Sequence, residues 1–108
     1  DVIALIYAHI PKENKTEFFR RLLPFLKTGG YVLFEGFSKE QREYQKQNES
    51  AGGPKDIEML FSEDELSTIF QDLEIIKLEK CITTLSEGIG HSGESAIIRM
   101  IARKSNVK

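Results

Sequence analysis

Hydrophobic and polar positions divide the first third of the chain into strand, helix and strand. The apolar run Val2–Ala8 is typical of a parallel strand covered on both faces. Apolar side chains then recur at helical spacing over Lys12–Lys27, where Pro24 is expected to bend or restart the helix and two glycines to end it. A second apolar strand, Tyr31–Phe37, follows. Two parallel strands joined by one helix predict a right-handed βαβ crossover.

The middle of the chain is dominated by polar residues. Ser38–Ser50 is polar on nearly every face, which predicts a solvated helix or a mobile cover and no part in the core. After a glycine-rich break, Met59–Phe61 returns to the core. Ser62, with Glu65 three residues later, has the capping-box pattern that begins another helix.

The last third predicts two strands, Leu73–Leu85 and Ser95–Arg103. The short glycine-rich loop between them favours an antiparallel hairpin over a crossover. We therefore expect one α/β domain over residues 1–108, with a mixed four-stranded sheet flanked by helices. In this sheet only the last strand is expected to be antiparallel. The first three strands then share one carboxyl end, where ligands bind in open α/β sheets.

Four side chains are expected to converge at that carboxyl end. His9 follows the first strand, Glu35 and Phe37 end the second, and the hairpin loop brings His91. Each has an ordinary structural alternative. His9 could cap the strand end through a backbone hydrogen bond, His91 could fix its tight turn, Glu35 could be solvated, and Phe37 could pack in the core. In the fourth strand, Arg99 is expected to pair with an acid or to extend toward water.

Composition narrows the classes of partner. The formal net charge of −2 arises from interleaved acidic and basic residues, which argues against a nucleic-acid surface. No apolar run approaches the roughly 20 residues of a membrane span. Cys81 is the only cysteine, so we expect a small buried side chain in a reducing, cytoplasmic compartment. One cysteine and two distant histidines do not provide the ligand spacing of a structural zinc site.

Several motifs resemble the C-terminal half of class I S-adenosylmethionine-dependent methyltransferases. DVIALIYAHIP resembles the fourth strand of that family, and LLPFLKTGGYVLFEGF resembles its glycine turn into the fifth strand, with Thr28 where proline is usual. LSEGIGHSGESAIIRMIARK and GGPKDIEMLFSEDEL resemble a small bacterial branch akin to the tellurite-resistance methyltransferases. The resemblance covers nearly the whole chain and implies a partial Rossmann-like fold. Together with the short hairpin, it predicts the strand order one, two, four, three.

The resemblance also implies roles for the residues at the carboxyl end. It places the S-adenosylmethionine cofactor beside Tyr7, Ala8 and His9. The acceptor side would then include Glu35, Phe37, Tyr44 and His91. Methyl transfer to a nucleophilic acceptor depends mainly on in-line alignment, so it needs no strong acid-base constellation. For this reason the residues do not identify the small-molecule acceptor or any catalytic group.

The glycine-rich cofactor loop of the family and its ribose-binding acid precede the fourth strand, and this sequence does not contain them. We therefore expect a C-terminal part of a longer domain, which alone neither binds S-adenosylmethionine measurably nor acts as an enzyme. The alternative is a non-enzymatic α/β regulatory or interaction module. A short hydrolase is disfavoured because the sequence has no G-x-S-x-G elbow.

The first strand is also expected to govern self-association. If it has no neighbour on its outer side, its unpaired backbone groups and adjoining apolar patches favour pairing with another chain. We expect a two-fold homodimer in which Val2–Ala8 pairs antiparallel with its own copy.

Overall fold

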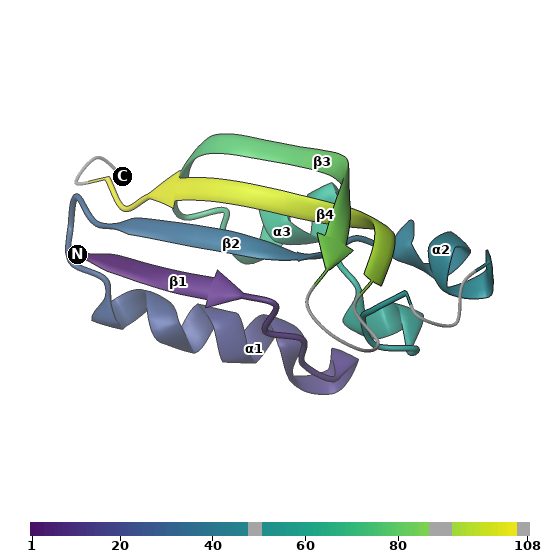
Figure 1. The fold of residues 1–108 in the computed structure, drawn as a ribbon. Coiled ribbons are helices and arrows are strands. Elements are labelled where there is room, and N and C mark those ends of the chain that lie inside the picture. The colour runs from purple at the N-terminus through teal and green to yellow at the C-terminus, as the bar shows by residue number, and fades with distance from the viewer. Residues whose placement is uncertain (48–50, 87–91, 106–108) are drawn as a thin grey trace.

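The computed structural model describes residues 1–47, 51–86 and 92–105 and shows helices packed on a four-stranded mixed sheet (Figure 1). The elements, in chain order, are β1 (Val2–Ile6), α1 (Lys12–Leu22), η1 (Leu23–Phe25), β2 (Tyr31–Phe37), α2 (Gln41–Gln47), η2 (Ile57–Met59), α3 (Glu63–Ile69), β3 (Glu74–Ser86) and β4 (Ser92–Arg103). The α/β class expected from the sequence is confirmed.

The sheet has the strand order β1-β2-β4-β3. β1 pairs parallel with β2, with Val2 opposite Tyr31, while β4 pairs antiparallel with both β2 and β3. β1, β2 and β3 therefore run in one direction, toward the end of the sheet where α2 lies in Figure 1. This confirms the predicted strand order and the antiparallel last strand.

Helices α1 and α3 bury one face of the sheet. Phe19 of α1 and Leu66 of α3 are fully buried in one core cluster with Leu5, Val32 and other inward side chains of all four strands. The opposite side chains of β1 and β2 are exposed: Val2, Ile6, Tyr31 and Leu33. β1 is thus covered on one face only, although its apolar run predicts cover on both.

The first helix breaks where the sequence predicts. α1 ends at Leu22, and a short 3₁₀ turn with Pro24 carries the chain to an extended residue, Leu26. Gly29 then adopts a φ of +87°, a conformation that favours glycine. Among the described residues, no helix is both long enough and apolar enough to span a membrane.

The polar segment after β2 contributes to the core, so the expectation of a purely solvated cover was wrong. Gln41 and Gln45 of α2 are buried. The Gln41 side chain accepts a hydrogen bond from the backbone N–H of Ala96 (2.8 Å) and donates one to the carbonyl of Gly52 (2.9 Å). Gln45 donates to the three carbonyls of residues 52–54. The two amides satisfy backbone groups of a glycine loop that has no regular partner, which is why these polar side chains are buried.

The helix after the glycine loop has half of its predicted capping box. The Ser62 hydroxyl accepts a hydrogen bond from the backbone N–H of Glu65 (3.1 Å). The Glu65 carboxylate, however, is bound to Lys15 of α1. The acid that the capping box needs is therefore used to join α3 to α1.

Candidate functional site

The carboxyl end of β1 turns sharply at Tyr7. This residue has a φ of +55°, the only described non-glycine residue with a positive φ, and such a conformation costs on the order of 1 kcal/mol. Its backbone N–H donates to the carbonyl of Glu35 (2.6 Å), and its hydroxyl donates to Glu35 Oε2 (2.7 Å). Both contacts hold the turned residue against the end of β2, so the strained conformation is fixed by its neighbours.

His9 joins the ends of β1 and β2. Its Nε2 accepts a hydrogen bond from the backbone N–H of Phe37 (3.2 Å), and its ring stacks on that of Phe37 with centroids 5.5 Å apart. Phe61 lies at the same centroid distance on a tilted ring. This geometry is the strand-end alternative stated from the sequence. The cofactor-binding role of His9 stays a prediction.

Burial makes His9 a weak base. Desolvation is the main cause that lowers the pKa of the imidazole, a hydrogen bond with the Tyr7 backbone opposes it, and the nearby charge of Lys15 adds to the lowering, which gives a pKa of about 4. The ring is therefore neutral near pH 7, with its Nε2 lone pair already engaged. In this arrangement His9 positions the two strand ends and has no free lone pair at Nε2 to take up a proton.

Glu35 is bound on both carboxylate oxygens. Tyr7 donates to Oε2, and Arg99 Nε donates to Oε1 (2.8 Å). Burial alone would raise the pKa of Glu35, but the hydrogen bonds from Tyr7 and Arg99 and the guanidinium charge outweigh it and lower the pKa. Glu35 is thus an ionised anchor between three strands, and the expectation that Arg99 pairs with an acid is confirmed.

The remaining candidates are placed less centrally. Phe37 is buried with Leu60 and Ile97, in contact with Tyr7, so it packs as a core residue at the edge of the site. Ala8 is half-buried against the main core, and Tyr44 is half-buried on α2, outside the aromatic contacts found among described residues. His91 lies outside the described residues. The structure therefore brings together Tyr7, His9, Glu35 and Phe37.

Lys15 of α1 is a neighbour of this site that sequence reasoning missed. Its side chain is only 2% exposed, and its Nζ donates to the carbonyl of Leu60 (2.9 Å) and to both oxygens of Glu65 (3.1 Å each). The ammonium also lies 4.5 Å from the centroid of Phe61, the ring that contacts His9. Burial lowers the pKa of Lys15, and the Glu65 carboxylate opposes that shift.

A signal for Lys15 exists in the helical spacing. It precedes Phe19 by four positions and Leu22 by seven, so it extends the apolar stripe of α1 toward the carboxyl end of the sheet. A lysine on a buried stripe needs an acid, and its partner, Glu65, lies far along the chain in the capping box. Spacing can identify such a lysine, but it cannot identify the acid. In the described part of the chain, no cluster of His, Cys, Asp or Glu side chains could hold a metal ion.

Comparison with known proteins places this geometry in a wider group of structures. No protein-family model and no curated protein matches the sequence. Among solved structures, TehB from Haemophilus influenzae matches with a TM-score of 0.68 at 19% identity over 97% of this chain and 35% of its own length. A S-adenosylmethionine-dependent methyltransferase from Methanosarcina mazei matches with a TM-score of 0.68 at 17% identity, over 97% of this chain and 59% of its own length. A third structure, a S-adenosylmethionine-dependent methyltransferase from Anabaena variabilis, matches with a TM-score of 0.67 at 13% identity, over 94% of this chain and 48% of its own length.

At these identities the likeness concerns the fold. The chain spans between 35% and 59% of the length of these structures, so it corresponds to part of each. The resemblance stated from the sequence motifs is confirmed at this level. The chain has the α/β fold of TehB and of the two S-adenosylmethionine-dependent methyltransferases.

Proposed function

We propose that this chain provides the methyl-donor rim and the acceptor side of a S-adenosylmethionine-dependent methyltransferase in the cytoplasm. The observation that carries the proposal is the meeting of Tyr7, His9, Glu35 and Phe37 at the carboxyl end of the sheet, on a fold whose solved neighbours are such enzymes. The methyl acceptor would be a small molecule that contacts Glu35, Phe37, Tyr44 or His91.

The residues at the rim suit a cationic methyl donor in one respect. Tyr7 and His9 are half-buried aromatic rings, and aromatic faces attract cations. S-adenosylmethionine, when bound, supplies a methyl group activated by its positive sulfur. The chain itself would orient the two reactants. The turn at Tyr7 and the hydrogen bond between His9 and Phe37 fix the carboxyl end of the sheet, so that donor and acceptor would meet in line.

Titration calorimetry tests the proposal in two forms of the protein. This chain alone should show no micromolar affinity for S-adenosylmethionine, because the resemblance places the glycine-rich loop before the first strand. The longer gene product should bind the cofactor and transfer methyl groups, and His9→Ala should reduce turnover more than the exposed change Lys46→Ala. Equal turnover of the two variants would remove His9 from the site.

One observation favours the alternative, a non-enzymatic α/β module. The Nε2 of His9 and both carboxylate oxygens of Glu35 already have partners within the chain. Residues upstream of Asp1 in the gene distinguish the two functions. A glycine-rich strand-to-helix loop there supports the enzyme, and its absence supports the module.

We also propose that a second copy of the chain pairs with β1 in a two-fold dimer. The proposal is supported by an edge strand without charge or proline, in which Val2 and Ile6 are each 56% exposed. An antiparallel pair centred on Ala4 would place Val2 beside Ile6 of the partner subunit. Sedimentation at micromolar concentration should show a dimer that Ala4→Lys dissociates. A wild-type monomer, or rapid exchange of the outward-facing amides of Ala4 and Ile6 at that concentration, would contradict the proposal.

A further inference from the structure

A hollow lies at the amino end of the sheet, opposite the candidate site. Its volume is about 810 Å³, within the range of small-molecule pockets. Three separate parts of the chain form it: the end of α1 with η1, the turn before β3, and the end of β4. The lining residues are Arg20, Leu23, Pro24, Gln71, Asp72, Leu73, Lys104 and Ser105.

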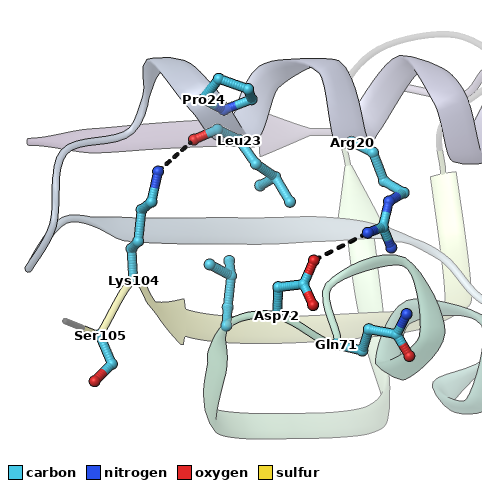
Figure 2. A pocket seen from close by; sticks show the side chains of 8 residues that line it. Arg20, Leu23, Pro24, Gln71, Asp72, Lys104 and Ser105 are labelled. Carbon is cyan, nitrogen blue, oxygen red and sulfur yellow. Dashed lines mark hydrogen bonds and ion pairs between the residues drawn. The ribbon is translucent and has the colours of Figure 1, made fainter. Parts of the chain in front are cut away.

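The lining combines an apolar surface with an excess of positive charge. Leu23, Pro24 and Leu73 provide the apolar part. Two lining residues are cations, Arg20 and Lys104, and one is a carboxylate, Asp72, which leaves one positive charge. Figure 2 shows the two cationic side chains on opposite sides of Leu23, with Asp72 reaching toward Arg20.

Both cations keep hydrogen-bond donors for a ligand. Lys104 Nζ donates to the carbonyls of Leu23 (3.1 Å) and Leu26 (2.9 Å), which uses two of the three ammonium donors. Within the described ranges, no carboxylate forms an ion pair with Lys104. Of its five N–H donors, Arg20 uses one in a hydrogen bond to Asp72 (2.9 Å) and another in a longer hydrogen bond to the carbonyl of Ile69 (3.4 Å).

We propose that this hollow binds a small organic monoanion, a carboxylate carried on a compact apolar body. A single negative charge balances the single excess positive charge of the lining, whereas a dianion would exceed it. The carboxylate would accept hydrogen bonds from Lys104 and Arg20, and the apolar body would lie on Leu23, Pro24 and Leu73. Since the hollow is remote from the carboxyl end of the sheet, its occupant would bind alongside the methyl donor and not compete with it.

Amide chemical shifts of the whole chain test this with hexanoate as the probe and hexanamide as its neutral isostere. Hexanoate should shift the amides of Gln71, Leu73 and Lys104 with a dissociation constant of about 1 mM, a value suited to so small a ligand. Hexanamide should bind at least about tenfold more weakly, because it lacks the charge. Equal binding of the two probes, or no shifts in this region with hexanoate, would overturn the proposal.

A variant with an added charge keeps the test independent of stability. Gln71→Glu places a carboxylate on the exposed rim of the hollow without removing a described hydrogen bond, and it should weaken hexanoate binding about fivefold through repulsion. Gln47→Glu makes the same exchange at an exposed position on α2, at the other end of the molecule, and should leave binding unchanged. If both variants bind hexanoate as the wild type does, the site lies elsewhere and the proposal fails.

Discussion

The two ends of the sheet differ in how far their ion pairs are buried. At the carboxyl end Lys15 is 2% exposed and bound to Glu65, Leu60 and the face of Phe61. At the amino end the Arg20–Asp72 pair has side chains 36% and 67% exposed. Charges removed from water depend on their partners, whereas exposed charges can exchange partners for water at little expense. The buried ion pair at the carboxyl end should therefore contribute more to stability than the exposed pair at the amino end.

The largest effect is expected from removing the buried charge. Lys15→Met leaves the Glu65 carboxylate without its partner and removes one of the two donors to the Leu60 carbonyl, so the free energy of unfolding should fall by about 3 kcal/mol. Urea denaturation followed by circular dichroism measures the loss. Lys12→Met removes the same charge from the exposed pair with Glu58 and should change stability by less than about 1 kcal/mol. Similar losses of unfolding free energy in both variants would contradict the expectation that the buried ion pair contributes more to stability than the exposed one.

Two glycines with positive φ provide a matched pair, one at each end. Gly53→Ala should cost about 2 to 3 kcal/mol, because the added Cβ would lie 2.9 Å from the Phe37 ring and the φ of +96° strains any side chain. Gly29→Ala meets only the end of Arg103 at 4.0 Å, so it should cost about 1 kcal/mol for its φ alone. Thermal unfolding of the two variants compares them directly. A Gly29 variant as unstable as the Gly53 variant would show that the amino end is equally tightly packed.

Acid should act on the carboxyl end first, through His9. Its folded pKa of about 4 lies below the ordinary 6.5, so the unfolded state binds the proton more tightly. The stability it contributes is complete above pH 6.5 and is lost as the pH falls toward 4. We expect a loss of about 2 kcal/mol, reduced for the partial exposure of the ring. The difference in pH dependence between wild type and His9→Asn isolates this group. If the free energy of unfolding changed equally with pH in the two proteins between pH 6.5 and 4, the prediction would be contradicted.

The smallest effect is expected at the exposed ion pair. Asp72→Asn should lower stability by no more than about 0.5 kcal/mol, because both side chains are open to solvent. Chemical denaturation should scarcely distinguish the variant from the wild type. A loss above about 1.5 kcal/mol would mean that the amino end also relies on its charges for stability.

More of the fold than of the candidate site could be predicted from the sequence. Local patterns of periodicity and turn residues indicated the break at Pro24 and the antiparallel last strand, whereas the strand order also needed the resemblance to the methyltransferases. The positive φ of Tyr7 and the burial of Gln41 could not be predicted, since both depend on partners distant in sequence, Glu35 and Ala96. Lys15 was missed for the same reason: the acid that allows its burial lies 50 residues later in the chain.

The place of β4 in the sheet has a consequence for the order of folding. It is the last strand in sequence yet lies between β2 and β3, with Tyr31 opposite Arg103. During synthesis β1, α1 and β2 can assemble through nearby contacts, but β2 has no partner on its other side until β4 emerges. The edge of β2 therefore stays open to other chains until β4 is synthesised, and late insertion of a central strand is slow because it closes a long loop. The time spent in that half-formed state, more than the stability of the finished sheet, would set the yield of folded protein.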